Sequence, residues 1–169
     1  MKKILLTTLI SLGVLFSFGQ QTWDNFEDQR RAFYDFTHGT FIPYFGNPDT
    51  AGNPSPVVAE YTRNAAEAFD VIVLDAVSPT EDLADYLSGT KQMSIDVWSP
   101  AAGLTIQITL EDSSLATGTN FPIGRHSVYL TTTTVANQWE TLTFSFDSRP
   151  YPNVPNTTVS RLILLFNPN

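Results

Sequence analysis

The fold is decided by residues 93–112, which read MSIDVWSPAAGLTIQITLED. Apolar and polar residues alternate on both sides of a break at residues 99–102. Before the break, Met93, Ile95 and Val97 share one face, and after it every second residue from 104 to 110 is Leu or Ile. A period of two is typical of a half-buried β-strand. The stretch therefore predicts two strands, each with one apolar and one polar face.

We expect these two strands to pair as a hairpin. Residues that face each other across a hairpin must share a face, and placing Val97 opposite Leu104 satisfies this condition. The loop would then be residues 99–102, because Pro100 and Gly103 end strands and supply turns. The polar face of this predicted hairpin would be open to water.

The rest of the chain also favours short strands separated by turn residues. Residues 69–76 and 159–166 are apolar on both faces, which predicts central strands covered on two sides. Residues 46–56 are rich in Gly, Pro, Asn and Asp and predict a loop. Residues 80–89 predict a short helix, capped by Thr80 and ended by Gly89. Further strands are predicted at residues 22–28, 32–37, 40–44, 57–63, 126–133 and 139–147.

These patterns predict an all-β fold, an antiparallel β-sandwich with little helix. The expected core includes Ile95, Ile106, Ile108, Phe144 and Leu164. With 169 residues, of which 42% are hydrophobic and 15% charged, the chain can form a proper core. It has no cysteine, so disulfides, thiolate metal sites and a cysteine nucleophile are excluded.

The first residues have the pattern of an export signal. Lys2 and Lys3 precede a short apolar run at residues 4–18, and Ser17 and Gly19 supply small residues for cleavage. We predict a signal peptide at residues 1–19 and a β-sandwich module at residues 20–169. A membrane anchor is the alternative, but the run is short for crossing a bilayer. The mature chain is expected to be secreted or held at the cell surface, without membrane insertion.

The mature chain is strongly acidic. Without Lys2 and Lys3, 7 basic residues face 17 acidic ones, a formal net charge of −10. This charge disfavours binding to nucleic acid or to an anionic lipid surface.

Several motifs in order resemble a galactose-binding-like jelly-roll module of secreted bacterial multi-domain proteins, akin to carbohydrate-binding modules. The motifs are WDNFED, GNPSPVVAEYTRN, MSIDVWSPAAG, ITLED, GRHSVY, QWETLTFSF and LILLFNPN, between residues 23 and 169. The resemblance implies a non-catalytic module that binds a polysaccharide or glycan beside neighbouring domains of a longer chain. The family pattern continues with a last strand that this sequence lacks, so the module is expected to be truncated at its C-terminus.

The same resemblance implies a structural calcium ion. Glu27 matches its acidic ligand near the start of the module, whereas the acidic ligand of the last strand has no counterpart. Calcium is therefore expected to bind weakly or not at all.

Catalytic patterns are sparse. The two histidines, His38 and His126, do not form a zinc pair, and no Gly-x-Ser-x-Gly motif is present. Retaining glycosidases need two carboxylates roughly 5 Å apart, but neighbouring strand residues such as Glu111 and Asp112 diverge. The sequence favours a protein that is not an enzyme; a jelly-roll glycosidase or polysaccharide lyase is the less favoured alternative.

A glycan site needs aromatic rings for the apolar faces of sugars and polar side chains for their oxygens. The polar face of the predicted hairpin, with one residue from a neighbouring strand, supplies both aromatic rings and polar side chains. The predicted ligand-binding residues are Asp96, Trp98, Gln107, Thr109 and Tyr129. The alternative function is a structural or adhesive spacer module that binds no sugar.

Overall fold

The computed structural model describes residues 21–78 and 80–168, and the predicted signal peptide lies outside them. Strands make up 42% of the described residues and helix 3%, in an antiparallel multi-strand arrangement of the β-sandwich type. The predicted all-β fold is confirmed.

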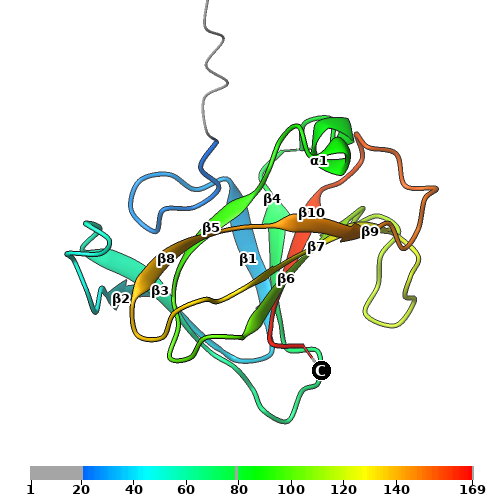
Figure 1. The fold of residues 1–169 in the computed structure, drawn as a ribbon. Coiled ribbons are helices and arrows are strands. Elements are labelled where there is room, and N and C mark those ends of the chain that lie inside the picture. Colours follow the sequence, from blue (N-terminus) through cyan, green and yellow to red (C-terminus); the bar gives the residue numbers. More distant parts are fainter. Residues whose placement is uncertain (1–20, 79, 169) are drawn as a thin grey trace, which may run out of the picture.

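One layer is a six-stranded antiparallel sheet with the strand order β1-β4-β10-β6-β7-β9. β4 and β10 lie in its interior, which confirms the two strands predicted to be central (Figure 1). The bounds are β1 (Ala32–Thr37), β4 (Val71–Ala76), β6 (Thr105–Glu111), β7 (Arg125–Thr132), β9 (Ser145–Ser148) and β10 (Arg161–Phe166).

The facing layer consists of two separate strand pairs. β2 (Thr40–Gly46) pairs with β3 (Val57–Thr62), and β5 (Ser94–Trp98) pairs with β8 (Trp139–Thr143). Ile95, Val97 and Leu142 of the second pair pack against the core, and this pair crosses the six-stranded sheet in Figure 1.

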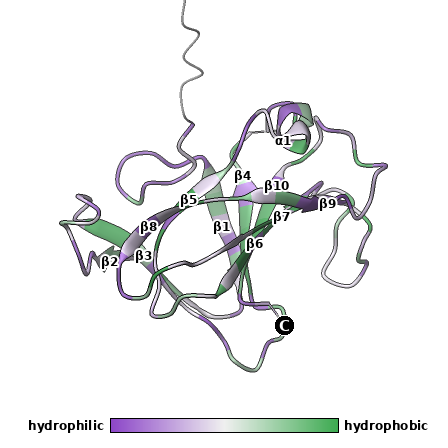
Figure 2. Ribbon diagram, in the orientation of Figure 1, coloured by the Kyte–Doolittle hydropathy of each residue, from purple (hydrophilic) through white to green (hydrophobic). Residues whose placement is uncertain are grey.

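The core between the layers contains the residues predicted for it. Ile106, Ile108 and Phe144 are buried, and Ile95 and Leu164 pack against them. Figure 2 shows the hydrophobic residues concentrated on the strands, while β9 at the sheet edge is mostly hydrophilic.

The predicted hairpin within residues 93–112 is wrong. β5 pairs with β8, so Val97 lies opposite Glu140, and β6 pairs with β10 and β7. Residues 99–104 carry the chain from one layer to the other. Both strands still turn their apolar faces to the core, because alternation fixes which face is buried and leaves the pairing partner open.

Two other predicted strands differ from the structure. Residues 22–28 form a loop, in which the side-chain oxygen of Asn25 accepts hydrogen bonds from the backbone N–H groups of residues 27, 28 and 29. Residues 139–147 divide at Phe144, whose N–H donates to the carbonyl of Met93 (2.9 Å). β8 therefore belongs to one layer and β9 to the other.

The helix α1 (Ala84–Ser88) has five residues and ends at Gly89, which has φ 78° as a left-handed cap. Thr80 does not cap it. The hydroxyl of Thr80 donates instead to the carbonyl of Val159, and Leu83 stands at the cap position. Within residues 21–78 and 80–168, no helix has the length and apolar character needed to cross a membrane.

Candidate functional site

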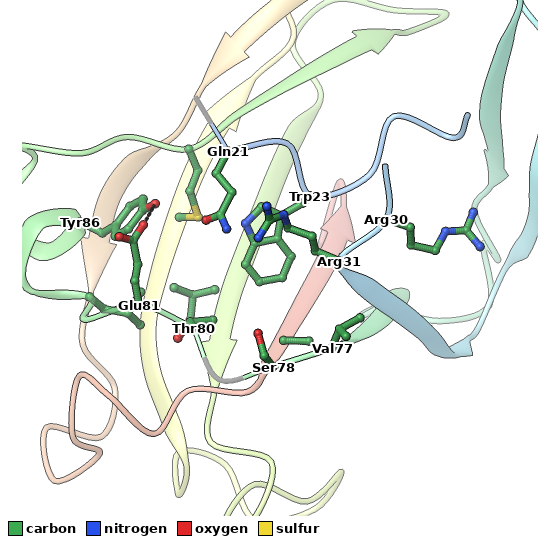
Figure 3. A pocket seen from close by; sticks show the side chains of 13 residues that line it. Gln21, Trp23, Arg30, Arg31, Val77, Ser78, Thr80, Glu81 and Tyr86 are labelled. Carbon is green, nitrogen blue, oxygen red and sulfur yellow. Dashed lines mark hydrogen bonds between the residues drawn. The ribbon is translucent and has the colours of Figure 1, made fainter. Parts of the chain in front are cut away.

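A cavity of about 440 Å³ opens at one end of the sandwich. We call it the end pocket. Segments far apart in the sequence form it: residues 21–31, the end of β4 with the segment after it, α1, the residue before β5 and the end of β6 (Figure 3). Its lining is Gln21, Trp23, Arg30, Arg31, Ala76, Val77, Ser78, Thr80, Glu81, Leu83, Tyr86, Met93 and Leu110.

Backbone hydrogen bonds fix the wall that carries Trp23. The N–H of Arg31 donates to the carbonyl of Trp23 (2.7 Å), and the N–H of Val77 donates to the carbonyl of Arg31 (2.9 Å). The segment is thereby tied to the chain just after β4. The Trp23 ring is half-buried against the core and projects into the pocket in Figure 3.

A second wall carries a polar network around Glu81. The Tyr86 hydroxyl donates to Oε1 of Glu81 (2.9 Å), and the Lys91 ammonium donates to Oε2 (2.5 Å). These hydrogen bonds, first that of Lys91 and then that of Tyr86, hold the pKa of Glu81 below its ordinary value. Burial, followed by the neighbouring Glu81, raises the pKa of Tyr86 to about 12. Glu81 is therefore ionised and Tyr86 neutral at ordinary pH.

Arg30 and Arg31 face opposite ways, as successive residues of an extended segment do. The Nε of Arg30 donates to Asp24 (2.9 Å), and its side chain extends away from the pocket in Figure 3. Arg31 is exposed at the pocket. Within the described part of the chain, its guanidinium forms no salt bridge and no side-chain hydrogen bond.

The pocket thus combines two aromatic rings, an apolar floor that includes Leu83 and Leu110, and a polar rim. Leu83 and Leu110 are buried. The rim offers amide, hydroxyl, carboxylate and guanidinium groups from Gln21, Ser78, Thr80, Glu81 and Arg31. Pockets of 300–1,000 Å³ with apolar walls and a few polar groups are typical of small-molecule sites. The sequence reading missed this site, because no local pattern links segments that only the fold brings together.

The five predicted ligand-binding residues do not form one site. Asp96 and Trp98 lie on β5, facing away from the core. Gln107 and Thr109 lie on β6 in the other layer, where Gln107 donates to the Thr109 hydroxyl (3.0 Å). Tyr129 is 3% exposed and belongs to the core. The grouping depended on the hairpin, which does not form, and the burial of Tyr129 removes it from any surface.

Asp96 and Trp98 have a new neighbour in Trp139. Trp98 lies directly opposite Trp139 across the β5–β8 pair, and Asp96 lies opposite Thr141, whose hydroxyl donates to it (2.5 Å). We call this surface the ribbon face. The Trp139 indole N–H donates to the side chain of Asn47 (3.0 Å), which ties the ribbon face to the loop at residues 46–56.

Glu27 lies on the exposed loop before β1, where its carboxylate accepts a hydrogen bond from the Ser55 hydroxyl (2.7 Å). Across residues 21–78 and 80–168, no cluster of three or more His, Asp or Glu side chains is arranged to hold a metal ion. Glu27 is therefore not joined by other acidic ligands in the described residues.

His126 is fully buried. Its ring nitrogens lie 2.8 Å from the Ser127 hydroxyl and 3.1 Å from the side-chain oxygen of Asn156. Burial lowers its pKa below the ordinary value. His126 therefore forms hydrogen bonds inside the protein and is not accessible to a substrate.

The chain was compared with protein families, curated proteins and solved structures. No protein family, curated protein or solved structure matches it.

Proposed function

We propose that the protein is a non-catalytic carbohydrate-binding module of an exported surface protein. The observation that supports this best is the end pocket, in which Trp23 and Tyr86 stand beside a hydrogen-bonding rim. Sugars present a face of C–H groups and a periphery of hydroxyl groups. Aromatic rings suit the first, and amides, hydroxyls and carboxylates suit the second.

The rim groups keep hydrogen-bonding capacity for a ligand. The Thr80 hydroxyl donates to the carbonyl of Val159 (3.0 Å), and its oxygen can still accept. The Glu81 carboxylate has two oxygens with several acceptor positions, of which Tyr86 and Lys91 occupy two. Both groups are held in place, so little side-chain freedom would be lost when a sugar binds.

Binding to a glycan array tests this proposal. We expect the wild-type chain from Gln20 onward to be retained on one or more glycans. Gln21→Ala and Glu81→Gln should weaken that retention without lowering the melting temperature, because both residues are exposed. Trp23→Ala should abolish it, and its melting curve must be recorded because Trp23 also packs against the core.

Substitutions on the ribbon face provide the matched control. Asp96→Ala and Trp98→Ala should leave glycan retention unchanged if the sugar sits in the end pocket. If these two variants lose binding and the pocket variants keep it, the sugar contacts the ribbon face instead. If the wild-type chain binds no glycan, the protein is better explained as a structural or adhesive spacer.

A further inference from the structure

Of the three charged residues that line the end pocket in the described part of the chain, two are paired. Arg30 is paired with Asp24, and Glu81 is paired with Lys91. Arg31 lines the same pocket, and within residues 21–78 and 80–168 its guanidinium has no carboxylate within salt-bridge distance. The pocket therefore offers an exposed cation that the described part of the protein does not neutralise.

We propose that the end pocket takes an acidic sugar, a uronic acid of a polysaccharide, whose carboxylate pairs with Arg31. This inference rests on the proposed function and narrows its ligand class. The planar guanidinium matches a carboxylate with two parallel N–H···O bonds, and such charge-assisted bonds are stronger than those between neutral groups. Trp23 receives the face of the sugar ring, while Gln21 and Thr80 contact its hydroxyls.

The backbone of Arg31 is ordered before any ligand arrives. Its N–H donates to the carbonyl of Trp23 and its carbonyl accepts from the N–H of Val77, so the backbone positions that carry the Trp23 ring and the Arg31 side chain are fixed relative to each other. A sugar that stacks on Trp23 therefore lies beside the segment from which the Arg31 side chain extends. This arrangement suits one carboxylate on one sugar ring. It does not provide a row of cations for a long run of negative charges.

The acidic character of the whole chain is compatible with this pairing. At physiological ionic strength the Debye length is about 8 Å, so charges farther from the ligand are largely screened. The acidic group in the pocket lining, Glu81, already accepts hydrogen bonds from Lys91 and Tyr86.

Methyl esterification of the glycan gives a direct test, because it removes the carboxylate charge and keeps the polymer backbone. The ligands are polygalacturonate and alginate, each also in methyl-esterified form, with a neutral glucan and a neutral galactan. Affinity is measured by gel retardation and by calorimetry near 0.15 M salt. The variants are Arg31→Gln, Arg31→Lys and Arg63→Gln, the last a matched control that lies outside the pocket lining.

We expect the wild-type chain to bind at least one acidic polymer, and esterification to weaken that binding about tenfold or more, as the loss of a charge-assisted pair implies. Arg31→Gln should produce the same loss, Arg31→Lys a smaller one, and Arg63→Gln none. Equal binding of acidic and esterified polymers, or of neutral glycans alone, overturns the acidic-sugar inference and leaves glycan binding standing. Failure to bind any of the six ligands or an array glycan overturns both. If Arg31→Gln does not fold, the comparison of acidic and methyl-esterified polymers with the wild-type chain still tests the inference.

Discussion

Ile106 is among the largest fully buried side chains of the described residues. It is 2% exposed on β6, in the interior of the six-stranded sheet, and lies opposite Phe166 of β10. Ile106→Ala should lower the free energy of unfolding by about 2–5 kcal/mol, because it removes buried methylene groups and leaves a cavity. Urea denaturation measures this change. A loss under about half a kcal/mol would contradict the core position of Ile106.

His126 gives the protein a predictable response to acid. Since burial lowers its pKa in the folded state, the unfolded chain binds the proton more readily. The contribution of His126 to stability is therefore complete above about pH 6.5 and decreases as the pH falls below that value, by at most about 1.4 kcal/mol per pH unit.

Urea midpoints measured from pH 8 to pH 5 test this response. The slope between pH 6.5 and pH 5 should be shallower in His126→Gln than in the wild-type chain. Parallel curves for the wild type and His126→Gln would show that His126 does not control the acid response.

At the scale of single elements, the loop at residues 112–124 depends on Gly124. Gly124 has φ 80°, and a Cβ atom added there would lie 2.5 Å from the backbone nitrogen of Ala116. Gly103 has nearly the same φ, 83°, with no atom within 4 Å of an added Cβ. Gly103→Ala should cost about 1–2 kcal/mol from the left-handed backbone alone. Gly124→Ala should cost clearly more, and equal thermal shifts in the two variants would contradict the close contact.

The same loop is closed by Arg125, which is buried at the start of β7. Its Nε lies 3.0 Å from Glu111, and its terminal nitrogens donate to the carbonyls of Thr117 (2.6 Å) and Ile123 (2.7 Å). Arg125→Met should destabilise the fold by about 3–5 kcal/mol, because it leaves Glu111 buried without a partner.

Limited proteolysis should show the loop of Arg125→Met cut before the rest of the chain, since its carbonyls lose their donor. Adding Glu111→Gln to Arg125→Met should recover part of the lost stability, as expected when an uncompensated buried charge is removed. If the double variant is no more stable than Arg125→Met, the ion pair is not the cause of the loss.

The strands themselves were easier to predict than the strands with which they pair. The alternation from Met93 to Leu110 identified β5 and β6 and the faces they bury, because burial acts on each residue separately. It could not show that β5 pairs with β8, since any strand with a matching apolar face meets the same requirement. Strand 139–147 was predicted as one element because its alternation continues through Phe144, where the chain passes between layers. The candidate site was predicted on β5 and β6 because these strands were expected to pair with each other. The end pocket instead depends on contacts between segments that are distant in the sequence, such as those that carry Trp23 and Tyr86.

At the scale of the whole molecule, β10 connects the two halves of the large sheet. Residues 161–166 pair with β4 on one side and with β6 on the other. Without β10 the buried residues of β4 and β6 would lose their neighbours, and their backbone groups would lose ladder partners. A chain ending at Ser160 should therefore lack a cooperative thermal transition. A cooperative transition near the wild-type temperature would show that β10 is dispensable.

The position of β10 near the end of the chain also determines when the large sheet can form during synthesis. Each of its pairings joins segments that are many residues apart, so the sheet closes only by long-range contacts, and folds of high contact order are slow to form. As the chain emerges from the ribosome, β4 and β6 are exposed well before the strand that separates them. Apolar strands waiting in this state are prone to aggregate, which makes this interval the one in which a chaperone would be most effective. Strong induction, which makes many incomplete chains at once, should therefore lower the soluble yield more than weak induction at the same final amount of chain.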